Sequence, residues 1–198
     1  MRDKTPTIGV LALQGAFQEH IDVLRALGAA VYELRQKSDL EIRSYDGIVL
    51  PGGESTAQSN LLKKTGMYDE IKALIKNGVP VLGTCAGAIL LSEKVEGGER
   101  HLATLPVSIK RNAYGRQLGS FITEGDFGKL KKVPMNFIRA PYFAKLNNPE
   151  VQILSRIDNK IVAVKYENQI AMSFHPEVTG DTRIHQYFLN EIANSSGG

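Results

Sequence analysis

Two kinds of apolar pattern alternate along the first half of the chain. Short runs rich in Val, Ile and Leu predict buried strands, and longer runs with one apolar helical face predict helices. The predicted strands cover residues 7–13, 30–34, 47–50 and 79–83, and the predicted helices cover residues 17–27 and 67–76. Gly28 and Gly78 follow these helices, where a left-handed cap residue is expected. Alternating strands and helices are typical of an α/β fold with a mostly parallel sheet.

The second half of the chain consists mainly of consecutive strand-like runs. These runs cover residues 108–122, 135–139, 151–157, 160–166 and 169–174. Two-residue breaks at Asp158-Asn159 and Glu167-Asn168 predict antiparallel hairpins. A final amphipathic helix is expected over residues 182–193, followed by a flexible tail over residues 195–198. We therefore expect a single domain over residues 1–194.

Composition narrows the class of protein. The 198 residues are 42% hydrophobic and 23% charged, which is typical of one soluble domain. With 24 Lys and Arg against 21 Asp and Glu, the charge balance does not favour a nucleic-acid partner. The apolar run at residues 8–13 is too short for a signal peptide or a membrane span. A single cysteine fits a reducing compartment, so we expect a cytoplasmic protein with no membrane partner.

The lone cysteine lies in the sequence Gly83-Thr84-Cys85-Ala86-Gly87, between a predicted strand and a helix-like run. Small residues two positions to either side allow the sharp turn that exposes a nucleophile at the top of a sheet. The positive end of a helix dipole also stabilises a thiolate. The alternative is a buried, inert cysteine, which is the usual role of a lone cysteine in a soluble domain. The flanking glycines favour the nucleophile.

His175 is the best candidate for a base, because it ends a predicted strand and precedes Pro176-Glu177. A residue before proline is held in extended geometry, and residues i and i+2 of an extended chain project to the same side. His175 and Glu177 are therefore expected to be neighbours, with the carboxylate orienting the imidazole. The other histidines are more simply explained as packing or surface residues: His20, His101 and His185.

Two adjacent glycines close the third predicted strand in the sequence Pro51-Gly52-Gly53-Glu54-Ser55. Such a segment can turn backbone N–H groups towards a developing oxyanion. The alternative is an ordinary turn in which Glu54 or Ser55 caps the next helix. The phosphate-loop signature G-x-x-x-x-G-K-[ST] and metal-ligand spacings are absent from the sequence, so neither a cofactor nor a metal is expected.

Together these segments resemble the class I (triad) glutamine amidotransferases, and within that family the glutaminase subunits of two-component pyridoxal 5'-phosphate synthases. The motif around Cys85 and the segment His175-Pro176-Glu177 are typical of the whole family. The segments that point to the narrower group are Leu13-Gln14-Gly15, Arg111-Asn112-Ala113-Tyr114-Gly115-Arg116-Gln117 and Phe137-Ile138-Arg139-Ala140-Pro141. The resemblance implies a three-layer α/β fold, with a mostly parallel central sheet flanked by helices and antiparallel strands in the second half.

The resemblance also implies an activity and its residues. The activity is hydrolysis of L-glutamine to L-glutamate and ammonia, with the ammonia channelled to a separate barrel-type synthase subunit in a large hetero-oligomer. Cys85 would be the nucleophile, His175 the general base and acid, and Glu177 the orienting carboxylate. Contacts to glutamine are implied for Gly52, Gly53, Glu54, Arg111, Ile138 and Arg139. The oxyanion would be held by the N–H groups of Ala86 and of Gly52 or Gly53.

Two alternatives remain open at this point. A triad does not identify the acceptor of the ammonia, so the glutaminase subunit of another amidotransferase, such as imidazole glycerol phosphate synthase, would carry the same three residues. A non-catalytic regulatory subunit with the same fold would have no need to keep Cys85, His175 and Glu177 together. Release of glutamate from glutamine separates the enzyme from the regulatory subunit.

Overall fold

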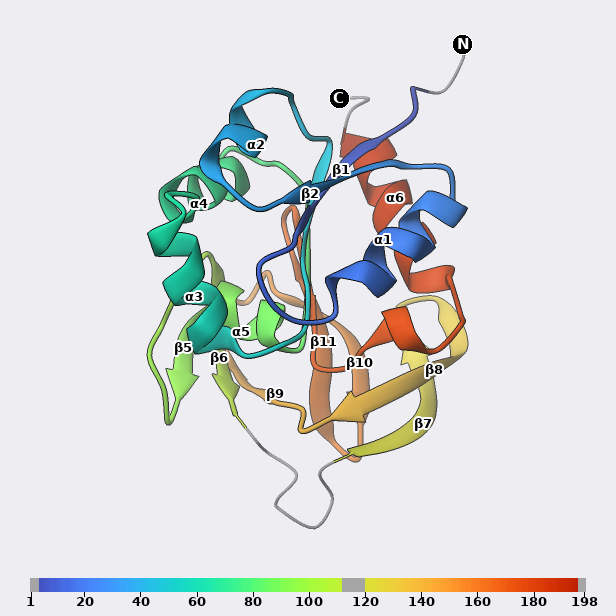
Figure 1. The fold of residues 1–198 in the computed structure, drawn as a ribbon. Coiled ribbons are helices and arrows are strands. Elements are labelled where there is room, and N and C mark those ends of the chain that lie inside the picture. The colour runs from blue at the N-terminus through green and yellow to red at the C-terminus, as the bar shows by residue number, and fades with distance from the viewer. Residues whose placement is uncertain (1–3, 112–119, 196–198) are drawn as a thin grey trace.

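The computed structural model describes residues 4–111 and 120–195, and its centre is a large sheet with helices on both faces (Figure 1). Helices α2 (Lys37–Glu41), α3 (Ser55–Lys64) and α4 (Tyr68–Lys76) lie on one side of the sheet. Helices α1 (Phe17–Ala26) and α6 (Arg183–Ser195) lie on the other side. The expected three-layer α/β fold is confirmed.

The strand order separates a parallel half of the sheet from a mostly antiparallel half. The parallel half consists, in order, of β2 (Ala30–Leu34), β1 (Thr7–Leu11), β3 (Gly47–Leu50), β4 (Val81–Thr84) and β12 (Gln169–Met172). The order continues through β11 (Lys160–Tyr166), β9 (Tyr142–Leu146), β6 (Leu105–Lys110) and β5 (Ser92–Glu96), with β10 (Gln152–Ile157) also paired to β11. Of these later pairs, only β5 and β6 are parallel. Strands β7 (Ser120–Phe127) and β8 (Leu130–Ile138) form a separate antiparallel hairpin.

The parallel strands are apolar on both faces because helices cover each side. In β1, Ile8 and Val10 pack into the core beside α1 and α6, whereas Leu11 packs on the opposite side beside α3 and α4. In β3, Ile48 and Leu50 belong to the α3 and α4 side. All five side chains are 0% exposed. This two-sided burial explains why the strands appear in the sequence as continuous apolar runs.

One predicted strand is wrong. The run at residues 108–122 is divided between β6 and β7, which belong to different sheets. Arg111 leaves β6 in a turn, and residues 112–119 lie outside the described residues. Apolar residues continue on both sides of this gap, so hydrophobic pattern alone does not mark the change of sheet.

Several elements were not predicted, and some ends differ. Helix α2 and strands β5 and β9 are additional. From the sequence, helix α3 is expected only as the helix that Glu54 or Ser55 would cap, because its sequence STAQSNLLKK has few apolar residues. Strand β1 ends at Leu11, two residues before the predicted end. Helix α6 continues through Ser195, which the sequence predicts as part of the tail, and residues 196–198 lie outside the described residues.

The predicted turns are confirmed by backbone conformation. Asp158 and Asn159 join the antiparallel strands β10 and β11, with φ values of 47° and 63°. Positive φ at both central residues is typical of the type I′ turn of a two-residue hairpin. The second predicted break joins the antiparallel strands β11 and β12, with a φ of 49° at Glu167. Gly28 and Gly78 follow α1 and α4 with φ values of 90° and 92°, as expected of left-handed cap residues.

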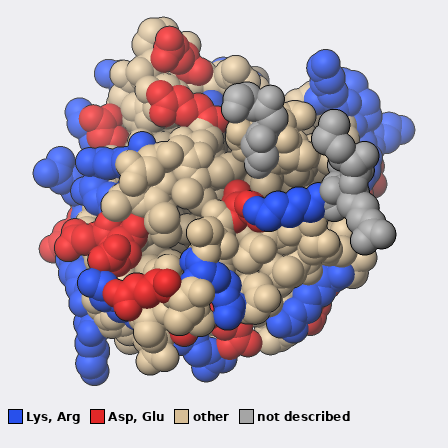
Figure 2. Space-filling view, turned by 90° about the horizontal axis from the view of Figure 1, so that it is seen from above, with Lys and Arg blue, Asp and Glu red and all other residues tan. Residues whose placement is uncertain are grey.

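Charged side chains of both signs are interspersed over the face that is seen when the molecule of Figure 1 is viewed from above (Figure 2). Among the described residues visible on this face, neither sign covers a broad continuous area. A separate finding concerns helix length: within residues 4–111 and 120–195, no helix is long and apolar enough to cross a membrane.

Candidate active site

Four segments meet at one edge of the parallel half of the sheet. Because β1, β3, β4 and β12 are parallel, the segments that follow them emerge at the same edge. In chain order these segments carry Gln14, Gly52-Gly53-Glu54, Cys85 and His175. Ligand sites of open α/β sheets lie outside this carboxyl edge. The topology therefore brings together residues that are far apart in the sequence.

Cys85 occupies a sharp turn between β4 and helix α5 (Ala86–Leu91). Its φ is 49° and its ψ is -103°, a strained conformation for a residue with a side chain. A β-carbon at Gly87 would lie 1.9 Å from the carbonyl oxygen of Leu50, and one at Gly83 would lie 2.9 Å from the Gly87 backbone. Only glycine allows these backbones to approach so closely. The strand–turn–helix geometry predicted around Cys85 is confirmed.

His175 and Glu177 are neighbours, as the sequence predicts. Nδ1 of His175 lies 2.6 Å from Oε1 of Glu177, and both side chains are buried. His175 has the expected extended backbone, with a φ of -107° and a ψ of 90°. The prediction that the chain stays extended is wrong, because Pro176–Val178 forms a 3-10 turn that brings the carboxylate to the ring.

The charges around His175 favour its protonated form. Burial opposes that form, but hydrogen bonds with Cys85 and Glu177 raise the pKa of His175 to about 10. Burial also opposes ionisation of Glu177, yet His20 and the hydrogen bond from His175 hold the pKa of its carboxyl below the usual value. At neutral pH the pair is therefore an imidazolium hydrogen-bonded to a carboxylate. Such a ring can exchange a proton with a group bound at Cys85.

The glycine segment after β3 is fixed by hydrogen bonds from other loops. The backbone N–H of Ala16 donates to the carbonyl oxygen of Gly52 at 3.0 Å. The backbone N–H of Glu54 donates to Oε1 of Gln14 at 2.9 Å, so the loop after β1 braces the loop after β3. Gly53 has a φ of 155°, and a β-carbon there would lie 2.4 Å from Oε1 of Gln14. The backbone conformation favours glycine at position 53, and a side chain there would also displace the Gln14 amide that braces the loop.

Glu54 has two sets of partners within the protein. Its carboxylate caps α3 by accepting hydrogen bonds from the backbone N–H groups of Thr56 at 3.1 Å and Ala57 at 2.7 Å. Oε1 of Glu54 also lies 3.0 Å from Nη2 of Arg111. Burial opposes ionisation, but the two backbone bonds and Arg111 hold the pKa of Glu54 below its usual value. The helix cap considered as an alternative in the sequence is therefore present, in addition to an ion pair.

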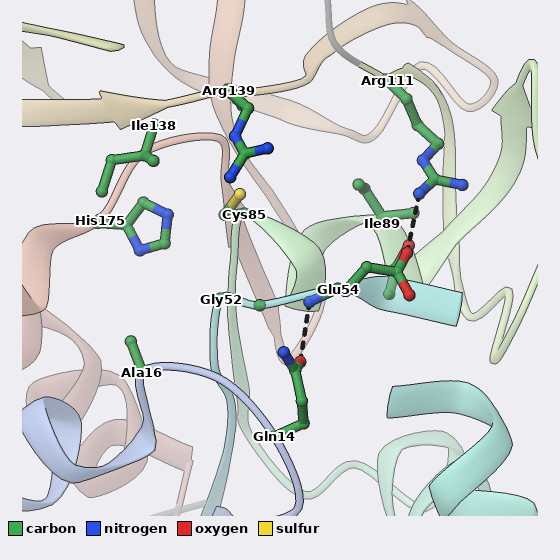
Figure 3. A pocket seen from close by; sticks show the side chains of 12 residues that line it. Gln14, Ala16, Gly52, Glu54, Cys85, Ile89, Arg111, Ile138, Arg139 and His175 are labelled. Atoms are coloured by element: carbon green, nitrogen blue, oxygen red, sulfur yellow. Dashed lines mark hydrogen bonds and ion pairs between the residues drawn. The ribbon is translucent and has the colours of Figure 1, made fainter. Parts of the chain in front are cut away.

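A pocket of about 510 Å³ opens above Cys85 (Figure 3). Eight of the sequence-predicted site residues line it: Gly52, Gly53, Glu54, Cys85, Arg111, Ile138, Arg139 and His175. Arg139 extends towards Cys85 from the end of β8 and has a φ of 44°. Glu177 lies behind His175, and Ala86 begins α5 beside Cys85, so neither of these two lines the pocket.

Sequence reasoning missed two groups of residues at this site. The first group, Gln14, Ala16, Ser55 and Ile89, lines the pocket. The parallel topology could have found Gln14, because it follows β1 as the glycine segment follows β3. The second group is buried behind Glu177 and consists of His20, Thr84 and His185. A group of three or more His, Cys, Asp or Glu side chains fit to hold a metal was not found in the described part of the chain.

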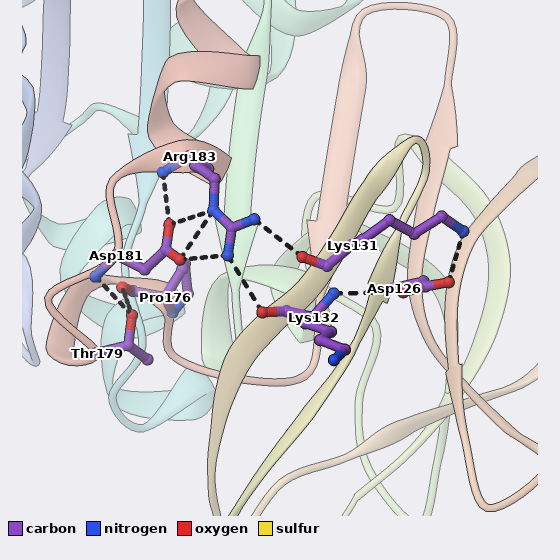
Figure 4. A network of polar contacts seen from close by, with 7 residues as sticks. All are labelled: Asp126, Lys131, Lys132, Pro176, Thr179, Asp181 and Arg183. Carbon is purple, nitrogen blue, oxygen red and sulfur yellow. Dashed lines mark hydrogen bonds and ion pairs between the residues drawn. The ribbon is translucent and has the colours of Figure 1, made fainter.

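A polar network holds the segment that follows Glu177 (Figure 4). Nη2 of Arg183 lies 2.6 Å from Oδ2 of Asp181. The same guanidinium donates to the carbonyl oxygens of Lys131 at 2.9 Å and Lys132 at 3.2 Å, in the β7–β8 hairpin. The backbone N–H of His175 also donates to a β8 carbonyl oxygen at 2.8 Å. The hairpin and the segment that bears His175 are therefore linked at two points.

Comparison with known proteins identifies the family. The model of the SNO glutamine amidotransferase family matches residues 10–194. This chain belongs to the SNO glutamine amidotransferase family. It is 53% identical over 192 residues to the pyridoxal 5'-phosphate synthase subunit PdxT of Desulfitobacterium hafniense (strain DSM 10664 / DCB-2), covering 96% of this chain and 94% of that protein. It is 48% identical over 189 residues to PdxT of Methanocorpusculum labreanum, covering 96% and 99%.

Solved structures place this SNO-family chain among glutamine amidotransferases. The crystal structure of a glutamine amidotransferase superposes with a TM-score of 0.88 at 39% sequence identity, covering 94% of this chain and 98% of the other. A glutamine amidotransferase from Thermotoga maritima superposes with a TM-score of 0.63 at 17% identity, covering 98% and 86%. At that identity the second likeness concerns the fold alone.

Proposed function

We propose that this chain is the glutaminase subunit of a pyridoxal 5'-phosphate synthase, which hydrolyses L-glutamine to L-glutamate and ammonia. The observation that carries the proposal is the shared pocket of Cys85 and His175, with Glu177 directly behind the imidazole. The relatives named as PdxT, at 53% and 48% identity over nearly the whole chain, support the choice of synthase.

In the proposed reaction Cys85 is the nucleophile. Its sulfur attacks the side-chain amide carbon of glutamine, and the carbonyl oxygen becomes an oxyanion. His175 gives a proton to the amide nitrogen, the C–N bond breaks, and ammonia leaves a thioester on Cys85. His175 then takes a proton from water, whose oxygen attacks the thioester carbon. The C–S bond breaks, glutamate leaves, and the Cys85 sulfur is regenerated as a thiolate beside the protonated His175. Glu177 keeps the other ring proton of His175 on Nδ1, which leaves Nε2 for this exchange.

We assign the oxyanion to backbone donors. The N–H of Ala86 begins α5 next to the attacking sulfur, and the N–H of Gly52 or Gly53 supplies the second donor. Neither donor has to be brought in by a mobile side chain. The close approach of Gly52 to His175, where a β-carbon would lie 2.2 Å from Cε1, supports a site in which this loop contacts the reacting groups.

We assign the amino-acid end of glutamine to the far side of the pocket. Glu54 would pair with the ammonium group of the substrate, and Arg111 with its carboxylate. Ile138 and Arg139 line the opposite wall beside Cys85. Glu54 and Arg111 also pair with each other, so binding of glutamine would replace one ion pair by two.

The ammonia requires an acceptor subunit. The proposed partner is a barrel-type synthase subunit in a large hetero-oligomer, and the word "subunit" in the names of the PdxT relatives supports a partner. We further propose that residues 1–194 act as one glutaminase domain, in the cytoplasm, without a cofactor of its own.

The experiment combines this chain with the barrel-type synthase subunit of a PdxT relative and its sugar-phosphate substrates. The expected result is glutamine-dependent formation of pyridoxal 5'-phosphate together with release of glutamate. Cys85→Ala should abolish both products, while free ammonia should restore cofactor formation. Glutamate release without cofactor formation would favour another acceptor, and the absence of glutamate release would favour a regulatory subunit.

A further inference from the structure

A chain of buried polar side chains lies behind Glu177, on the side away from the pocket. It joins His20 on α1 with His185 on α6, and both side chains are 0% exposed. Nδ1 of His20 lies 2.9 Å from Nε2 of His185. Nε2 of His20 lies 3.1 Å from Oγ1 of Thr84 and 3.5 Å from Oε2 of Glu177. Two histidines from helices that are far apart in the sequence therefore form a row of contacts that reaches the carboxylate of Glu177.

The surroundings of these rings fix where their protons are. Nδ1 of His185 is buried and has no hydrogen-bond partner among the described residues. A bare lone pair is tolerated there far better than an N–H that no acceptor satisfies. His185 therefore carries its proton on Nε2 and donates it to Nδ1 of His20. His20 in turn carries its proton on Nε2, facing Thr84 and Glu177.

The opposite pair of tautomers, with the protons on Nδ1 of each ring, is unfavourable at both histidines. It would leave an unsatisfied N–H on Nδ1 of His185, and it would direct the lone pair of His20 Nε2 at the carboxylate of Glu177. Oε2 of Glu177 makes no hydrogen bond of normal geometry with a described residue, and Nε2 of His20 lies 3.5 Å from it. The 3.5 Å separation is longer than a normal hydrogen bond, and the hydrogen bond of His20 Nε2 in this structure is with Oγ1 of Thr84 at 3.1 Å.

We propose that His20 is a positioning residue of the glutaminase, and that its Nε2–H fixes the Glu177 carboxylate so that Oε1 remains on Nδ1 of His175. His185 acts through His20 by holding the required tautomer. The inference rests on the proposed function, and it extends the triad by two histidines that do not touch the substrate.

Both histidines suit this role because they are neutral donors. Burial is the main cause that lowers the pKa of His185 to about 3, and burial likewise lowers the pKa of His20. The charged and titratable groups that act on His20 are Glu177, His175 and Glu19. A full positive charge behind Glu177 would compete with the His175 imidazolium for the carboxylate. An N–H dipole orients Glu177 without that competition.

The first experiment compares His20→Leu with His20→Gln in the complex with the barrel-type synthase subunit. Leu removes the donor, whereas the Gln amide keeps an N–H at similar reach. We expect His20→Leu to lower kcat for glutamine hydrolysis about 10-fold or more, with KM changed less than about twofold. The acidic limb of the pH profile should move to higher pH, because Glu177 becomes easier to protonate. His20→Gln should recover most of the activity and the original pH profile.

Matched controls separate positioning from packing. His101→Leu makes the same substitution at another buried histidine, which is 5% exposed and has no described contact with Glu177. It should lower the thermal unfolding temperature without moving the pH profile. Unchanged kcat and pH profile in His20→Leu would overturn the inference, as would equal losses in His20→Leu and His20→Gln.

A second measurement uses the unmodified protein, so it tests the proposed tautomers even if His20→Leu does not fold. Ring ¹⁵N chemical shifts of the unmodified protein should show His20 and His185 as neutral Nε2–H tautomers at neutral pH. An Nδ1–H tautomer or a charged ring at His20 would overturn the inference. Failure of the proposed function gives a different result, because the unmodified complex would then release no glutamate.

Discussion

Gly52 lies directly against the ring of His175: a β-carbon at Gly52 would be 2.2 Å from Cε1 and 2.9 Å from Nδ1. The glycine follows β3 and the histidine follows β12, so the fold alone brings these distant parts of the sequence together. The glycine loop and the imidazole therefore determine each other's position. Any side chain at position 52 has to displace the ring or the loop.

We predict that Gly52→Ala lowers glutamine hydrolysis about 100-fold, because a misplacement of the base of about 1 Å has a cost of that order. Steady-state kinetics with the synthase subunit present would measure it. Gly97→Ala is the matched control, since Gly97 also lies at a turn but a β-carbon there meets nothing within 4 Å. It should affect stability alone, and a Gly52→Ala variant as active as this control would contradict the prediction.

A second prediction concerns the strain at Cys85, whose φ is 49°. Cys85→Ala and Cys85→Gly should both be inactive, but the glycine variant should be more stable by about 1 kcal/mol, because glycine adopts positive φ without steric cost. Chemical denaturation would measure the difference. Ala88→Gly, inside α5, should instead lose about 1 kcal/mol relative to the unmodified protein. A lower stability of Cys85→Gly than of Cys85→Ala would show that the turn is not strained.

The contacts of this site also show which of its features can be predicted from the sequence alone. The glycines around Cys85 predict a sharp strand–turn–helix because their spacing is local, and His175 and Glu177 are two residues apart. The contact between His20 and His185 spans 165 positions, and Arg111 reaches Glu54 across 57. Contacts of that length depend on strand order and helix placement, which hydrophobic periodicity does not specify. The sequence therefore predicts only packing or surface roles for His20 and His185.

The third prediction is a pH dependence of stability. The pKa of His175 is raised from 6.5 to about 10, so its favourable interactions are fully present below pH 6.5 and are lost as the pH rises towards 10. The free energy of unfolding of the unmodified protein should exceed that of His175→Asn most at about pH 6 and least above about pH 10. Denaturation curves across this range would test it. In the Cys85→Ala background the dependence should weaken, because one of the two hydrogen bonds that raise the pKa is missing.

The fourth prediction concerns glutamine recognition. Arg111→Ala and Glu54→Ala should each weaken glutamine binding about 10-fold or more, because each removes a charge-assisted contact to the amino-acid end. Calorimetry in the inactive Cys85→Ala background would measure the dissociation constants. Glu54→Ala should also lose about 1 kcal/mol of stability as an N-cap, whereas Arg111→Ala should not.

Lys131→Ala provides the control for this test. It removes an exposed ion pair with Asp126, in which Nζ and Oδ2 are 2.7 Å apart, outside the pocket. Exposed pairs contribute little to stability because solvent screens them, so neither stability nor glutamine affinity should change measurably. If Arg111→Ala and Glu54→Ala bind glutamine as tightly as Lys131→Ala does, the two residues act only as a helix cap and a surface ion pair.

The last prediction is that the isolated chain is a poor glutaminase and that it is activated by the synthase subunit. The carbonyl oxygen of Gly52 accepts a hydrogen bond from Ala16, which fixes the orientation of the Gly52–Gly53 peptide. A glycine peptide can reverse at low steric cost, so a partner that contacts this loop can select the orientation that presents an N–H to the oxyanion. A missing oxyanion donor costs about 10²- to 10³-fold in rate, which sets the expected activation. We would measure glutamate production at saturating glutamine while titrating the barrel-type subunit. Full activity of the chain alone, unchanged by the partner, would mean that the loop is already competent in the free protein.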